Sequence, residues 1–211
     1  MPRRPLPPSA LRPSPGTLSL KKSLLATALL AAAGFTQANT YSVDPTHTFV
    51  TFEASHFGTS TLRGRFDRKE GSVTFDRAGK TGKAEITIDL ASVSTGVAPL
   101  DAQLKGRDFF NAAETPTARF VADRFAFSGD KVSEVAGSLT LLGKTLPVTL
   151  KATRFDCYAN PLFRREVCGG DFETTITRSQ WGMAYGLGFG LPDSIRLLVQ
   201  VEAVKQQAPG R

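Results

Sequence analysis

The chain has 211 residues and a formal net charge of +7. Residues 1–38 hold five of its 26 basic side chains and none of its 19 acidic ones, so residues 39–211 keep 21 basic against 19 acidic, a net charge of +2. Such a balanced remainder offers no excess of positive charge for a phosphate backbone, and we expect no nucleic-acid partner.

The first 38 residues have the order of a secretory signal peptide. Basic side chains precede an uncharged apolar run at residues 23–35, and Thr36-Gln37-Ala38 follows as a small-x-small cleavage site. The run of thirteen residues is shorter than the roughly 18 residues that a membrane-spanning helix needs. We expect cleavage after Ala38, a periplasmic location, and one domain at residues 39–211 without a transmembrane segment.

From Thr46 onward, short segments alternate apolar and polar side chains, which is the period of a half-buried strand. Turn residues such as those at 78–82 and 142–145 separate these segments. Only residues 99–110 look helical, and one short helix cannot link parallel strands repeatedly. The pattern therefore predicts an all-β fold, an antiparallel barrel of about eight strands with one short helix, whose closure removes exposed edges.

Two cysteines, Cys157 and Cys168, stand with ten residues between them. An oxidising compartment favours a disulfide between them, and their spacing is not that of a metal site. The only two histidines lack a third clustered partner for a metal ion. We expect the disulfide, no metal and no cofactor.

The order of several motifs resembles the YceI-like family. They are YSVDPTHTFVTFEASHF from residue 41, LRGRFDRKEGSVTFD from 62, IDLASVSTG from 88, LDAQLKGRDFFNAAETPTARF from 100, VAGSLTLLGKTLPVTL from 135 and TRSQWGM from 177. The resemblance covers residues 41–204 and implies a lipocalin-like barrel whose elongated apolar interior holds a polyisoprenoid, such as a quinone tail or a polyprenyl phosphate. It also implies a homodimer for some members. Residues 154–170, which carry both cysteines, depart from the family pattern.

The inward faces of the expected strands supply the candidate pocket. Its proposed lining residues are Phe52, Phe66, Phe75, Ile86, Ile88, Phe120 and Leu139. The residues alone leave two interpretations open, because a barrel of eight strands either fills itself with side chains or encloses a ligand. The resemblance favours the ligand cavity.

Polar residues at strand ends are candidates for contact with the head group of a ligand. His56, Arg178 and His47 match family positions, although a histidine bonded to its own turn explains His47 at least as well. Arg63 and Arg65 offer guanidinium groups to a diphosphate, but arginines that alternate with apolar residues usually form a solvated face. Asp101 is expected to cap the short helix or to tie down its loop.

These observations favour a periplasmic binding or carrier protein for a long polyisoprenoid. One alternative is an envelope stress or structural protein whose barrel is filled by its own side chains. An enzyme acting on a prenyl lipid is the weaker alternative, because the sequence holds no GxSxG, HExxH or Gly-rich phosphate motif. We therefore expect no catalytic residues.

Overall fold

The structure is a computed structural model that describes residues 1, 38–162 and 164–207. All of its secondary structure belongs to one unit, residues 35–211. The expected signal peptide falls almost wholly on residues 2–37 and thus outside the described residues. The elements run in the order β1 (Asn39–Val43), β2 (Phe49–His56), β3 (Ser60–Phe66), β4 (Lys69–Asp76), β5 (Thr81–Asp89), η1 (Leu90–Ser92), β6 (Val93–Ser94), α1 (Ala98–Lys105), β7 (Thr117–Ser128), β8 (Lys131–Leu141), β9 (Lys144–Asn160), β10 (Arg165–Thr177), η2 (Arg178–Trp181), η3 (Leu187–Phe189) and β11 (Ser194–Lys205).

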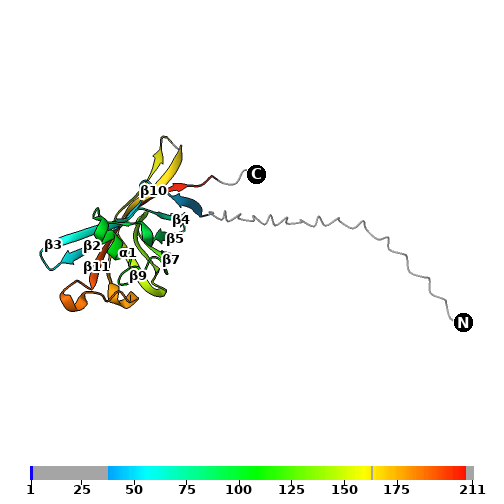
Figure 1. Ribbon diagram of the computed structural model, residues 1–211. Helices are drawn as coiled ribbons and strands as arrows, with labels where there is room; N and C mark the ends of the chain where they lie inside the picture. Colours follow the sequence, from blue (N-terminus) through cyan, green and yellow to red (C-terminus); the bar gives the residue numbers. More distant parts are fainter. Residues whose placement is uncertain (2–37, 163, 208–211) are drawn as a thin grey trace. The chain divides into compact units, whose positions relative to one another are not determined.

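The strands form one antiparallel sheet that closes on itself (Figure 1). Strand β1 pairs with β4 on one side and with β11 on the other, which closes the barrel. Three positions in the wall are interrupted strands, namely β1 with β2, β3 with β4, and β5 with β6. The two parts of the first two positions pair with the same neighbouring positions, and β6 pairs with β3 as β5 pairs with β4. Counting each interrupted pair once gives eight positions. The predicted antiparallel barrel of eight strands is confirmed.

Two β-bulges keep the apolar side chains of the longest strands on the inner face. In β7, the pairing with β8 skips Asp123, so that Phe120 and Phe125 both face inward although they are an odd number of positions apart. In β9, the pairing with β10 skips Thr153, and the inward series passes from Leu150 to Phe155. A bulge inserts one residue and restores the facing that a strict period of two would lose.

The sequence expectations were wrong in one segment and incomplete in two others. The helix is shorter than residues 99–110, because α1 ends at Lys105 and Gly106 leaves the helical conformation. Residues 39–43 form β1, although the alternation was traced only from Thr46. Residues 154–170, which had no assigned structure, lie mostly in the extended hairpin of β9 and β10 that projects at the top of Figure 1.

The disulfide between Cys157 and Cys168 is confirmed. The two residues lie directly opposite each other in the β9–β10 ladder, and their Cα atoms are 4.1 Å apart. Cys168 is buried in the core of the barrel. The bond therefore links the two strands of the hairpin at the level where they leave the barrel.

Candidate functional site

Two apolar cavities occupy the interior of the barrel. The larger has a volume of about 340 Å³, within the range of small-molecule sites, and the smaller about 100 Å³. Val50 lines both, and successive inward residues of β11 pass from Ile195 in the larger cavity to Ala203 in the smaller. The cavities therefore follow one another along the same strands.

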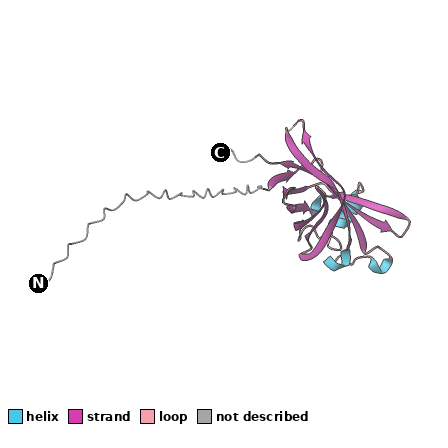
Figure 2. Cartoon of the chain, turned by 180° about the vertical axis from the view of Figure 1, so that it is seen from behind, coloured by secondary structure: helices cyan, strands magenta, loops and turns pink. Residues whose placement is uncertain are grey.

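The length of the interior can be judged from β11. From Ile195 to Ala203 the strand covers about 26 Å at the usual rise of 3.3 Å per residue, or about 20 Å along the axis of a barrel with strands tilted by roughly 40°. The larger cavity lies at the end where η2 and η3 are found. Figure 2 shows these helices at the end of the sheet away from the projecting hairpin. The interior is long and narrow, a shape that suits an extended chain.

The structure brings all seven predicted pocket residues to the interior. Four line the larger cavity and three the smaller. The first group is Phe52, Phe66, Ile88 and Leu139, and the second is Phe75, Ile86 and Phe120. Their contact with a ligand stays a prediction.

Aromatic rings are concentrated around each cavity. The centroids of Phe66 and Phe110 lie 5.3 Å apart in the larger one, with Phe52 within 6.4 Å of both. The ring of Phe52 needs the glycine opposite it, because a Cβ at Gly64 would lie 2.2 Å from the ring. Gly64 therefore leaves room in the barrel wall for the ring of Phe52, which lines the cavity.

The polar lining of the larger cavity lies at its mouth. Of the described residues that line it, four have polar side chains, namely Ser55, His56, Gln103 and Arg178, and none has a carboxylate. His56 ends β2, and its ring packs edge-on against the ring of Phe57 with centroids 4.8 Å apart. The arrangement provides an apolar tube with a polar rim at one end.

Arg178 lines this cavity, but its guanidinium binds the protein itself. Nε donates to the carbonyl oxygen of Pro192 at 2.7 Å, Nη1 to that of Met183 at 2.6 Å and Nη2 to that of Tyr185 at 2.8 Å. Burial lowers the pKa of the guanidinium, while the nearby carboxylate of Asp193 opposes that shift. Three carbonyl acceptors explain why this buried side chain is an arginine: it organises the segment between η2 and β11.

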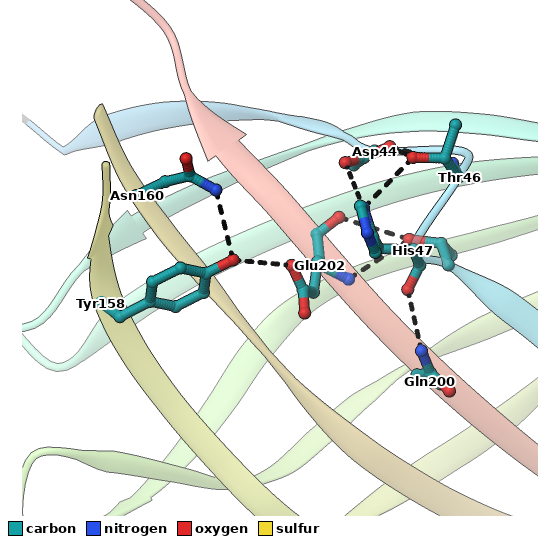
Figure 3. Close-up of polar contacts among 8 residues, drawn as sticks. Asp44, Thr46, His47, Tyr158, Asn160, Gln200 and Glu202 are labelled. Atoms are coloured by element: carbon teal, nitrogen blue, oxygen red, sulfur yellow. Dashed lines mark hydrogen bonds and ion pairs between the residues drawn. The ribbon is translucent and has the colours of Figure 1, made fainter. Parts of the chain in front are cut away.

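His47 lies away from both cavities, in the turn between β1 and β2 (Figure 3). Its Nδ1 is 2.8 Å from Oδ2 of Asp44, and this hydrogen bond raises the pKa of the exposed imidazole. Burial alone would raise the pKa of Asp44, but hydrogen bonds from Thr46 and His47 lower it to about 2. The geometry supports the turn-stabilising interpretation of His47 and not contact with a ligand in the barrel.

The remaining polar residues that were considered as ligand contacts or helix caps are bound to other parts of the protein. Arg63 donates to Glu53 at 2.7 Å, and Arg65 lies 2.8 Å from Asp67, both on the outer face. Asp101 accepts hydrogen bonds from the backbone and the hydroxyl of Thr95, which ties down the loop before α1, as expected.

Several lining residues were missed from the sequence. Phe109 and Phe110 were placed in the expected helix, but they follow it and reach the cavity from the loop. Met183 and Leu191 belong to a loop without strand or helix periodicity. The one signal that marks this loop is its composition, since residues 182–192 contain no Asp, Glu, Lys or Arg.

Comparison with known proteins places the chain. A model of the YceI-like domain matches residues 41–203. The chain belongs to the YceI-like family. It is 35% identical to a UPF0312 protein of Pseudomonas paraeruginosa over 193 residues, which cover 89% of this chain and the whole of that relative.

Solved structures of YceI-like proteins share the barrel. Burkholderia cenocepacia BcnA is 27% identical with a TM-score of 0.64, covering 76% of this chain and 98% of BcnA. The Campylobacter jejuni YCEI protein is 25% identical with a TM-score of 0.62, covering 72% and 90%. A polyisoprenoid binding domain from Saccharophagus degradans is 19% identical with a TM-score of 0.57, covering 79% and 98%, which shows a common fold.

The described residues include neither a membrane-spanning helix nor a cluster of metal ligands. Among the described residues, none of the helices has the length and apolar character needed to span a bilayer. Within the same part of the chain, His, Cys, Asp and Glu side chains do not gather in groups of three or more that could hold a metal ion.

Proposed function

We propose that this protein binds and carries a long apolar polyisoprenoid, a prenyl quinone or a polyprenyl phosphate, inside its barrel. The observation that carries the proposal is the pair of cavities in series, lined mainly by apolar side chains, with His56 and Arg178 at the end of the larger one near η2 and η3. A chain that is uniformly apolar with one polar end matches this distribution. The Saccharophagus degradans domain, described as polyisoprenoid binding, has the same fold.

Burial of an isoprenoid chain provides enough free energy for specific binding. Each CH₂ removed from water contributes about 0.8 kcal/mol, so ten enclosed carbons contribute about 8 kcal/mol before ordering costs. A net value near 8 kcal/mol corresponds to a Kd of about 1 μM. A chain longer than ten carbons therefore reaches micromolar affinity even after part of the gain is lost to ordering.

The periplasm is the compartment we propose, after removal of residues 1–38. The Cys157–Cys168 disulfide supports this location, because such bonds persist in oxidising compartments. Binding and transport are supported over catalysis by the lining of the larger cavity, whose described residues include one histidine and no carboxylate. A self-filled structural barrel is disfavoured by the same 340 Å³ of space.

Native mass spectrometry of the protein purified from a periplasmic extract tests the proposal. We expect a mature mass starting at Asn39, an intact disulfide and an added mass that is identified as a prenyl lipid after denaturation. Protein that is purified without a bound lipid, and that does not bind added farnesol or prenyl quinones, would contradict the proposal.

A cavity-filling variant gives the matched control. Ala118 lines the larger cavity, whereas Ala126 is exposed on the same strand. Ala118→Phe is expected to displace about three CH₂ groups of ligand and to weaken farnesol binding about 50-fold. Ala126→Phe should leave binding unchanged. Equal affinities for the two variants would place the ligand outside the barrel.

A further inference from the structure

Two loops at the mouth of the larger cavity have no charged residue. They are residues 55–61, which comprise the turn between β2 and β3 and the strand ends beside it, and residues 182–192, between η2 and β11; we call them the mouth loops. Neither contains Asp, Glu, Lys or Arg, in a chain that is 21% charged. Charged neighbours lie at the base of the second loop, where Lys144 approaches Gly182 and Asp193 binds Ser179.

Large aromatic side chains at the mouth loops are open to solvent. The exposed fraction is 78% for Phe189, 56% for Phe57 and 42% for Tyr185. Isolated exposed apolar residues are ordinary, but neighbouring ones beside a cavity indicate an interaction surface.

The mouth loops form one surface that continues into the cavity. A Cβ at Gly190 would lie 3.5 Å from the Phe57 ring, so the two loops are in contact. The ring of Tyr185 packs against that of Phe109, with centroids 5.4 Å apart, and Phe109 lines the cavity. An apolar path therefore runs from the exposed rings to the interior.

The second mouth loop is held in place without any partner. Arg178 binds three of its carbonyl groups, and the backbone N–H groups of Phe189 and Leu191 both donate to the carbonyl of Gly186 at 3.0 Å. Gly186 and Gly190 adopt left-handed conformations that allow this tight turn. Because the loop is ordered in advance, presenting its rings to a partner needs little further ordering.

We propose that the mouth loops dock on the surface of a lipid bilayer and place the open end of the barrel against the lipid. This inference rests on the proposed function, because a prenyl chain is insoluble in water and moves most easily between bilayer and cavity when it does not cross water. A membrane fits the loops better than a protein partner does, since protein interfaces surround an apolar centre with a polar rim. Exposed aromatic rings on loops that contain no Asp, Glu, Lys or Arg are suited to the headgroup region of a bilayer.

The absence of charge predicts how the bilayer is recognised. Peripheral proteins that use Lys and Arg depend on anionic lipids and are released by salt. Docking through the mouth loops should occur on neutral phosphatidylcholine vesicles and should change little between low and high ionic strength.

The test measures sedimentation of the exported protein with phosphatidylcholine vesicles that contain no prenyl lipid. Phe189→Glu adds a charge at the mouth, and Leu162→Glu adds the same charge at the tip of the β9–β10 hairpin, where Leu162 is 87% exposed. We expect Phe189→Glu to lower vesicle binding by about tenfold, the share of one buried aromatic ring, and Leu162→Glu to leave it unchanged.

Farnesol binding in solution separates this proposal from the proposed function. Both variants should bind farnesol like the wild type, because neither position lines a cavity. Wild-type protein that binds farnesol but not vesicles would overturn the docking proposal alone, and binding to vesicles without farnesol binding would overturn the proposed function alone. Equal losses in the two variants, release by salt, or a mouth-dependent dimer in place of vesicle binding would also overturn docking.

Discussion

The two ends of the barrel share one sheet but are built from different side chains. At the mouth, the loops are uncharged, aromatic and exposed, and a buried arginine holds them from below. At the opposite end, the β9–β10 hairpin carries a disulfide, and charged groups surround it: Glu166 accepts a 2.5 Å hydrogen bond from Tyr41 and lies 3.9 Å from Arg77. The hairpin end is thus held by a disulfide and by ionic side chains, whereas the loops of the mouth contain no Asp, Glu, Lys or Arg.

The polar contacts of the hairpin end extend to the outer surface. Figure 3 shows Asn160 of the hairpin donating to the hydroxyl of Tyr158, which donates to Glu202 of β11, beside the turn that holds Asp44 and His47. These contacts join the hairpin to strands that are distant in sequence. We therefore expect substitutions at the hairpin end to loosen the hairpin and substitutions at the mouth to affect the mouth loops, with little effect of either on the other end.

The largest effect is expected at Arg178. Arg178→Ala leaves three carbonyl groups without their donor, and hydrogen bonds to a charged group contribute roughly 1.5–3 kcal/mol each, so we expect about 4 kcal/mol less stability after partial relaxation. The measurement is the free energy of unfolding in urea. The exposed pair of Arg63 and Glu53 offers the control, because Arg63→Ala should cost less than about 1 kcal/mol. Similar costs at the two positions would contradict a special role for the buried arginine.

The second effect concerns the disulfide. Replacing Cys157 and Cys168 together by alanine removes the constraint on a loop of this size, for which the chain-entropy estimate is about 3 kcal/mol. Hydrogen exchange should become faster in residues 155–168 and remain unchanged in residues 182–192. Faster exchange in the mouth loop as well would show that the two ends are coupled.

The third effect comes from the buried hydroxyl of Tyr41. Burial, followed by the hydrogen bond to Glu166, raises the pKa of Tyr41 well above 10, so the folded protein keeps a proton that the unfolded chain loses in alkali. Stability from this group is complete below pH 10 and falls as the pH rises above it. Tyr41→Phe should lower stability by about 1 kcal/mol near neutral pH and flatten the decline above pH 10. A decline equally steep in the variant would assign it to other groups.

The smallest effect is expected in the turn of Asp44 and His47. Because the imidazole pKa is raised, its contribution is complete at acidic pH and is lost as the pH rises through the folded value. Asp44, with a pKa of about 2, contributes above pH 4 and loses its contribution as the pH falls toward 2. An NMR titration should show the pKa of His47 decreasing in Asp44→Asn, with farnesol binding unaffected. A titration that does not move would exclude Asp44 as the cause.

Much of the barrel was predictable because the period of two in a strand is a local property. Inward residues such as Phe52, Ile88 and Leu139 could be named from alternation alone. The disulfide was equally predictable, since the presence of two cysteines and the expected oxidising compartment were enough to suggest it. The hairpin around that pair was not assigned, because residues 154–170 lack long alternating apolar runs and gain strand structure by pairing with each other.

The candidate site was predictable in its apolar part and less so in its polar part. Arg178 was expected to meet a ligand head group, and its contacts with three carbonyl groups depend on a loop whose conformation has no sequence signature. His47 matched a family position, yet the break between β1 and β2 turns it away from the cavities. The end of a strand is set by pairing with strands that are distant in sequence, so the positions of polar groups at strand ends are the hardest to predict from the sequence.

The sequence by itself determined which side chains face inward, which two cysteines can pair and which surface segments lack charge. These are properties of period and composition that hold for any arrangement of the strands. Only the tertiary structure decided that β1 closes the sheet against β11 and that the interior encloses two cavities instead of filling itself. Enclosed volume depends on how strands far apart in sequence tilt and pack around the barrel, and no local pattern encodes that.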